Sequence, residues 1–256
     1  MHVVFRLSAR LTARWIAIIA ALSMSSVAYA QQIPAGTVIP VMLNASLNAA
    51  KDGAGKRFDG KVMQDVITAS GITIAKGSRI TGQVVSAAKS EGSGSSLILK
   101  FDSIDDHGST IPLTAAVLAI ASLQAVAQAQ APINSNPDML PASAWTTRQV
   151  GGDIVNRGQG RVGSSSGSTG TWLEGSSVLI KLTPNPDAGC PVGPGYDRAQ
   201  PVWIFSSSAC GTYDLGNLRI ENSGMNAPIG KVSITSDRNV QIRGGSGWLL
   251  ITVAAK

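Results

Sequence analysis

Strand and turn signals alternate at short intervals between residues 33 and 121, and this pattern constrains the fold more than any other feature of the chain. Segments with apolar residues at alternate positions are separated by turns rich in Gly, Ser, Asp and Lys. Helical periodicity is almost absent, and few residues are charged (14%) or aromatic (5%), which favours strands and turns. We predict a compact β-barrel or sandwich built from "TVIPVML" (37–43), "RFDGKVMQDV" (57–66), "GITIA" (71–75), "RITGQVVSA" (79–87), "SLILKFDSI" (96–104) and "STIPLTAAVLAIA" (109–121).

One phrase occurs three times: "IPAGTVIPVML" (33–43), "IAKGSRITGQV" (74–84) and, with one fewer spacer, "LEGSSVLIKL" (173–182). A chain that enters a strand from a tight turn needs a residue that accepts a positive φ, and Gly36, Gly77 and Gly175 supply it. The short hydroxyl residue after each glycine can bond neighbouring backbone as the strand begins. We interpret the phrase as a turn that opens a strand, in preference to a binding motif.

The remaining residues divide into two regions. Residues 122–171 contain three prolines followed by a Gly- and Ser-rich stretch, which predicts a flexible linker or insertion, partly disordered. Residues 172–256 return to strand signals and predict a second β-unit. Two alternatives stay open: a short helix instead of a buried strand within 115–130, and a first barrel that is completed by 172–182.

Residues 1–30 have the pattern of a secretory signal peptide. Three arginines precede the short apolar run "WIAIIAALSM", and "SVAYA" ends in an Ala-x-Ala cleavage signal. We predict cleavage between Ala30 and Gln31, and export of residues 31–256 to the periplasm or the cell exterior. The apolar run is short for a bilayer span, so an uncleaved anchor is the less favoured alternative. No membrane span is predicted in the mature chain.

The mature chain contains two cysteines, Cys190 and Cys210. In an exported protein, such a pair predicts a structural disulfide, and closing a loop of about 20 residues stabilises a fold by about 3 kcal/mol. A zinc site would need three or four ligands, and the sequence supplies no others. The second β-unit is therefore predicted to carry one disulfide.

The charge of the mature chain argues against nucleic-acid binding. The leader holds three of the 21 Lys and Arg residues and none of the 15 acidic residues, so 18 basic residues face 15 acidic ones, a net charge of +3. Nucleic-acid binding needs clustered basic residues, whereas these are spread along the chain.

Little in the mature chain predicts catalysis. Its one histidine, His107, stands beside Asp105 and Asp106 in "DDHGST", but these are ordinary residues of one predicted hairpin turn. A catalytic triad converges from separate elements. "GQGRVG" (158–163) matches G-x-G-x-x-G, but the "SSSGSTG" that follows cannot form the helix a dinucleotide site requires. We predict a protein that is not an enzyme and has no catalytic, cofactor-binding or metal site.

The aromatic residues give the best hint of binding. Trp172, Trp203 and Trp248 fall within predicted strands and are expected in the core. Tyr196 lies in "GPGYD" between the two cysteines. A disulfide-bounded loop rich in Pro and Gly (190–201) suits recognition, so Tyr196 is the candidate recognition residue.

The first two copies of the phrase, together with the segment between them, resemble the motifs of a known family. Pro34-Ala35-Gly36-Thr37, then "VMQDV" (62–66), then "IAKGS" (74–78) with Gly82 are similar to the motifs of the TrbI-like β-barrel family, components of type IV secretion and conjugation core complexes. The match covers about residues 33–121. Ala75 stands where that family has proline, and a cleavable leader replaces its inner-membrane helix and proline-rich spacer. The chain resembles a stand-alone exported relative of that barrel.

The resemblance implies a barrel that assembles side by side into rings, with itself or within an envelope complex. We therefore expect a non-catalytic structural or interaction module of the bacterial cell envelope whose partners are proteins. The alternative from another class is a periplasmic or secreted protein that binds a ligand, such as a glycan, through its aromatic residues. Exposed tryptophans would favour that alternative, whereas buried ones would favour the module.

Overall fold

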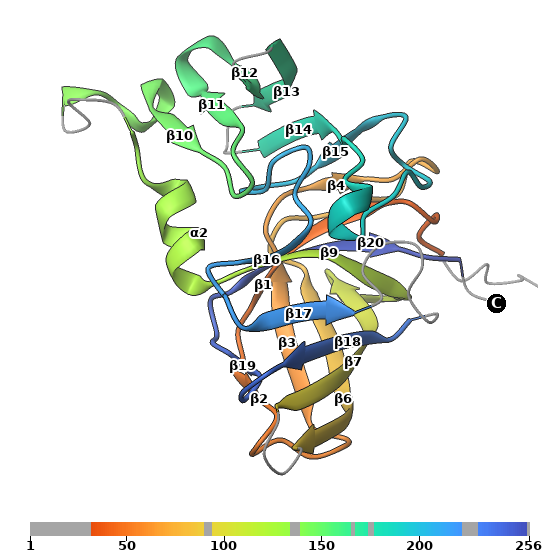
Figure 1. The fold of residues 1–256 in the computed structure, drawn as a ribbon. Coiled ribbons are helices and arrows are strands. Elements are labelled where there is room, and N and C mark those ends of the chain that lie inside the picture. The colour runs from red at the N-terminus through yellow and green to blue at the C-terminus, as the bar shows by residue number, and fades with distance from the viewer. Residues whose placement is uncertain are drawn as a thin grey trace, which may run out of the picture. The chain divides into compact units, whose positions relative to one another are not determined.

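The fold is all-β, as predicted, and the largest sheet, with ten strands, forms a nearly closed barrel (Figure 1). The computed structural model describes residues 32–89, 94–133, 139–164, 167–173, 177–221 and 230–254. The strand order in the barrel is β16-β9-β20-β1-β3-β6-β7-β18-β17, with β8 paired to β7. The strands are β1 (Val38–Leu43), β3 (Arg57–Val62), β6 (Arg79–Lys89), β7 (Ser95–Asp106), β8 (Ser109–Pro112), β9 (Ala115–Ala121), β16 (Gly211–Tyr213), β17 (Leu218–Glu221), β18 (Val232–Ser236) and β20 (Gly247–Thr252).

Every segment predicted as a strand between 37 and 121 contains one. The segment 57–66 divides into β3 and β4 (Val66–Ile67), which pairs with β5 (Thr73–Ile74). β2 (Leu47–Asn48) and β19 (Gln241–Ile242) form another two-stranded ladder. The hairpin predicted across "DDHG" joins β7 to β8, with Asp106 opposite Ser109. His107 and Gly108 both have positive φ angles (51° and 86°) in this two-residue turn, as expected for the twist of a tight hairpin.

The interior of the barrel is filled from alternate strand positions. Buried and less buried residues alternate along β3 and along much of β6 and β7, which is the period of a strand with one face on a core. The rings of Phe58, Phe101 and Trp248 meet edge to face, with centroids 5.5 and 6.0 Å apart. Gly82 leaves room for this cluster, because a Cβ at that position would overlap the Phe58 ring.

Strands β9 and β20 are buried at every position, which explains why their sequences run apolar instead of alternating. One face of each strand, including Val117 and Trp248, packs into the barrel core. The other face, including Leu118 and Leu249, packs into a second hydrophobic core. These two strands are therefore the wall shared by the two cores.

The second core lies against a separate six-stranded antiparallel sheet, with β10 to β15 in sequence order (Figure 1). We call residues 146–201, which contain it, the inserted sheet. Its strands are β10 (Thr146–Arg148), β11 (Ile154–Asn156), β12 (Arg161–Ser164), β13 (Gly167–Leu173), β14 (Ser177–Lys181) and β15 (Ala199–Pro201).

The strands are distributed differently from the predicted division into a barrel (31–121), a linker (122–171) and a second unit (172–256). The Gly- and Ser-rich stretch forms β12 and β13 because its glycines let backbones approach closely. A Cβ on Gly163 or Gly170 would overlap the backbone of the neighbouring strand. Within the segment 172–182, the described strand residues 172–173 and 177–181 join the inserted sheet and not the barrel. The barrel is instead completed by β16, β17, β18 and β20, which the sequence had placed in the second unit.

Both alternatives for residues 115–130 hold for part of the segment. The strand β9 ends at Ala121, and the helix α2 (Leu123–Gln130) follows it. The Ser122 side chain caps the helix by accepting a hydrogen bond from the N–H of Ala125, 3.0 Å away. Ala125, Val126 and Ala129 of this helix pack into the second core.

Two of the three predicted turn glycines have the expected backbone. Gly36 and Gly77 have φ angles of 79° and 93°, and β1 and β6 begin at the second residue after each of them. Gly175 lies outside the described residues, as do the predicted signal peptide and its cleavage site at Ala30 and Gln31. Gly36 has a further role, since a Cβ there would overlap the backbone carbonyl of Pro194 in the disulfide-bounded loop.

The predicted disulfide between Cys190 and Cys210 is present and buried. It joins the loop after β14 to the segment that leads back into the barrel at β16. Among the residues that the structure describes, no helix is long and apolar enough to cross a membrane.

Candidate functional site

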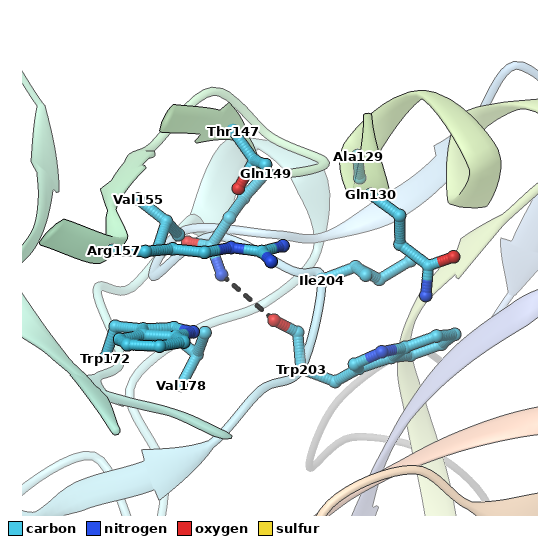
Figure 2. A pocket seen from close by; sticks show the side chains of 10 residues that line it. All are labelled: Ala129, Gln130, Thr147, Gln149, Val155, Arg157, Trp172, Val178, Trp203 and Ile204. Carbon is cyan, nitrogen blue, oxygen red and sulfur yellow. Dashed lines mark hydrogen bonds between the residues drawn. The ribbon is translucent and has the colours of Figure 1, made fainter. Parts of the chain in front are cut away.

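The strongest candidate site is a cavity of about 230 Å³ where α2, the inserted sheet and the loop after β15 meet (Figure 2). We call it the junction cavity. Apolar and aromatic side chains form most of its wall, and a few amide, hydroxyl and guanidinium groups interrupt them. It is lined by Ala129, Gln130, Thr147, Gln149, Val155, Arg157, Trp172, Val178, Trp203 and Ile204.

A buried glutamine from the barrel fixes one side of the cavity. Gln64, in the connection between β3 and β4, donates a hydrogen bond from Nε2 to the carbonyl of Val178 (2.9 Å). Its Oε1 accepts from the backbone N–H groups of Val178 (3.1 Å) and Trp203 (3.0 Å). Trp203 has a positive φ of 52°, unusual for a bulky residue. The amide bridge and the buried indole hold this conformation in place.

Arg157 supplies the positive charge of the cavity. It begins the short 3₁₀ helix η3 (Arg157–Gln159), and its guanidinium carbon lies 5.7 Å from the Trp145 ring and 6.0 Å from the Trp172 ring, within cation–π range. One terminal nitrogen donates to the carbonyl of Ala142 at 3.3 Å. Figure 2 shows the side chain extended over the Trp172 ring, toward the space between Gln149 and Ile204.

The electrostatic setting of Arg157 is unusual. No ion pair joins it to a carboxylate within the described part of the chain. Its buried Nε has no hydrogen-bond partner there. Partial burial lowers the pKa of Arg157 from its ordinary value by desolvating the guanidinium. The charge is thus held between two indoles without a counter-ion among these residues.

Gln149 supplies an unsatisfied acceptor. The residue is only 4% exposed, and its Nε2 donates to the carbonyl of Trp203 at 3.2 Å (Figure 2). That bond fixes the orientation of the amide, because the reverse orientation would place two oxygens against each other. The buried Oε1 is left without a partner in the described structure, a state that costs about 1–3 kcal/mol.

A second, larger cavity of about 570 Å³ lies near the beginning of α2 and includes Asp214 and Arg243. No aromatic side chain is among the described residues that line it. Its Asp214 carboxylate accepts a hydrogen bond from the Ser122 hydroxyl. The junction cavity is the better candidate because it combines aromatic walls with polar groups that lack partners.

Tyr196 does not have the exposed position expected of a recognition residue. It is 7% exposed and packs into the second core, and burial raises the pKa of its hydroxyl above the ordinary value. The loop that contains Tyr196 makes hydrogen bonds to the rest of the fold. Gln200 donates to the carbonyls of Gly36 (2.9 Å) and Gly195 (2.8 Å), which fastens this loop to the start of β1.

His107 lies apart from the junction cavity, in the turn between β7 and β8. Its side chain is 80% exposed and pairs with Asp106 at 3.1 Å. Asp106 in turn accepts from the hydroxyl of Ser78, and this hydrogen bond is the main cause that lowers the pKa of the Asp106 carboxyl. The group holds together the turn of the second phrase copy.

The tryptophans have mixed positions. Trp248 is fully buried in β20, as predicted, and Trp172 lies in β13 but is half-buried. Trp203 is buried, but in a turn and not in a strand. Gln149 and Arg157 were not predicted from the sequence. Gln149 follows Trp145 within "WTTRQV", but Arg157 stands far from any tryptophan in the sequence, and the side chains line one cavity only once the strands are paired.

Among the described residues, no group of three or more His, Cys, Asp and Glu side chains is placed to hold a metal ion. Comparison with known protein families and with curated proteins found no match to this chain.

Proposed function

We propose that this chain is a non-catalytic interaction module of the bacterial cell envelope, in which the barrel is the scaffold and the junction cavity is the binding site. The observation that carries the proposal is one small cavity that combines aromatic walls with Arg157, which has no counter-ion among the described residues. Such a site has groups that bind and orient a ligand. Its described lining includes no Asp, Glu, His or Cys to act as a general base or nucleophile.

The envelope location rests on the leader and the disulfide. Residues 1–30 have the sequence pattern of an export signal, and a disulfide is stable in the oxidising compartments outside the cytoplasm. The resemblance to the TrbI-like barrel favours the same location, and a stand-alone exported relative of that family is the identity we propose.

The tryptophans favour a protein or peptide partner over an open glycan platform. Sugar stacking needs an accessible indole face. Trp203 and Trp248 are buried, and the guanidinium of Arg157 covers the ring of Trp172. Glycan binding is the alternative function, and the experiment must distinguish it from peptide binding.

The test is a thermal-shift screen of oxidised residues 31–256 against short peptides and oligosaccharides. We expect a peptide to raise Tm in the wild type and in Leu173→Ala, and not in Trp172→Ala. Leu173 is the matched control because it neighbours Trp172 on β13, is 47% exposed, and is not among the residues that line the cavity. Mass spectrometry of the recovered ligand should show it unchanged. Binding that ignores Trp172→Ala, or conversion of the ligand, would overturn the proposal.

Self-association is a second candidate, favoured by two neighbouring exposed apolar residues. Met139 and Leu140 follow α2 and are 82% and 40% exposed, and exposed apolar side chains that gather in a patch mark protein contacts. Light scattering with size exclusion, at several concentrations, tests it. A discrete assembly that Met139→Ser with Leu140→Ser disperses would support a ring or other oligomer, whereas a monomer throughout would remove this candidate.

A further inference from the structure

We infer that the junction cavity binds the C-terminal residue of a peptide, with Arg157 pairing the carboxylate and Gln149 accepting a hydrogen bond from the peptide N–H. This inference rests on the proposed function and specifies the class of ligand. Three properties of the cavity, its charge, its acceptor and its size, lead to it separately.

The positive charge of Arg157 favours an anionic ligand. Arg157 is held between Trp145 and Trp172, and no carboxylate pairs with it among the described residues. The hydrogen bond to the carbonyl of Ala142 uses one terminal nitrogen, and Figure 2 shows the end of the guanidinium extending toward the space between Gln149 and Ile204. The remaining N–H groups of the guanidinium can bind a carboxylate through charge-assisted hydrogen bonds.

The unpaired Oε1 of Gln149 favours a ligand with a hydrogen-bond donor close to its anionic group. Gln149 and Arg157 line the same cavity, and the Oε1 of Gln149 is buried without a partner in the described structure. Because this oxygen is closed to solvent, a small opening of the surrounding side chains is needed before a ligand reaches it. A peptide N–H next to a terminal carboxylate supplies the missing donor in a single residue.

The size and the lining of the junction cavity favour a small ligand with an apolar part. Drug-sized ligands occupy pockets of about 300–1,000 Å³, and this cavity, at about 230 Å³, is smaller. Val155, Val178 and Ile204 offer apolar contacts without hydrogen-bonding groups. A residue with an aliphatic side chain suits this wall better than a sugar, whose hydroxyl groups would each need a partner.

The experiment uses three probes on the oxidised protein from residue 31 to 256: N-acetyl-leucine, its uncharged amide N-acetyl-leucinamide, and glucuronate. Binding is followed by tryptophan fluorescence and by calorimetry. We expect the acid to bind at least tenfold more tightly than the amide, because a charge-assisted bond is lost in the amide. Its affinity should fall with added salt, and glucuronate should bind weakly or not at all.

Variants assign the binding to the cavity. Arg157→Gln should remove the preference for the acid over the amide, whereas Arg148→Gln should keep it. Arg148 is the charge-matched control, since it is exposed on β10 and is not among the residues that line the junction cavity. Gln149→Met should weaken both probes. The comparison of acid with amide on the wild type needs no substitution, so it decides the matter even if a variant fails to fold.

Each outcome has one meaning. Equal binding of acid and amide overturns the role of the carboxylate and leaves the interaction module standing. Binding of glucuronate in preference to N-acetyl-leucine overturns the peptide and favours the glycan alternative. If none of the three binds, the C-terminal residue is the wrong ligand class, and the wider screen with Trp172→Ala decides separately whether the cavity binds anything.

Discussion

The barrel and the inserted sheet are both built mainly of antiparallel strands, and each packs on a hydrophobic core, but they differ in strand length and in what else stabilises them. The barrel has long strands, such as β6 and β7 of 11 and 12 residues, around a core of aliphatic and aromatic side chains. The inserted sheet has strands of three to seven residues and many glycines. It is fastened by a disulfide and by buried amide groups, those of Gln64 and Gln200. Alternating apolar residues therefore predict the strands of the barrel better than those of the inserted sheet.

A substitution in the barrel core should destabilise the protein more than any other change considered. Trp248→Ala removes a fully buried ring that packs against Phe101, and it should lower the free energy of unfolding by about 3–5 kcal/mol. Because β20 also forms the wall of the second core, chemical denaturation should show both regions destabilised together. Leu173→Ala, at an exposed position, should change little. A loss confined to the inserted sheet would contradict the shared wall.

This contrast also explains what could be predicted from the sequence. The alternating apolar residues of "RFDGKV" and "SLILKFDSI" predicted β3 and β7 because the barrel buries one strand face. The stretch from 146 to 173 has few apolar residues, and its strands exist through backbone pairing and close glycine contacts that leave no periodic signal. The junction cavity lies where the inserted sheet meets α2 and the loop after β15, and Gln149 and Arg157 line the same cavity only after the chain has folded.

The second comparison concerns the glycine turns in the first two copies of the repeated phrase, which have different surroundings. Gly36→Ala should cost about 2–5 kcal/mol, because a left-handed backbone conformation is strained and the new Cβ also overlaps the carbonyl of Pro194. Gly77→Ala has the same strain but open space around its Cβ, so about 1–2 kcal/mol is expected. Urea unfolding of the two variants gives the comparison. Equal costs would show that the Pro194 contact contributes nothing.

The disulfide should have a smaller and more local effect. Replacing both Cys190 and Cys210 by serine should lower stability by about 3 kcal/mol. The loss should concentrate in the inserted sheet, since the bond bounds the loop that holds β15. Hydrogen exchange should show faster exchange in β14 and β15, with β6 and β7 still protected. Uniform acceleration through the barrel strands would mean that the two regions unfold as one.

The smallest effect concerns pH and the second copy of the phrase. The Asp106 carboxylate accepts hydrogen bonds from the Ser78 hydroxyl and the Ala75 N–H, and the Ser78 bond is the main reason that the pKa of this carboxyl lies below its ordinary value. A folded pKa below the unfolded one means that the ionised form stabilises the fold. Its contribution is therefore complete above the unfolded pKa and is lost as the pH falls through the folded value.

Asp106→Asn should accordingly destabilise the protein at neutral pH, and the difference from the wild type should shrink as the pH is lowered from about 5 to about 2. Thermal unfolding across this range measures it. Asp105→Asn is the neighbouring control, because that carboxylate accepts from the Gly108 N–H within the same hairpin turn. If the difference for Asp106→Asn is independent of pH, the carboxylate acts only through its shape. The turn of the second copy would then be held by the hairpin and its glycine, whereas the first copy is fastened by Pro194 and Gln200.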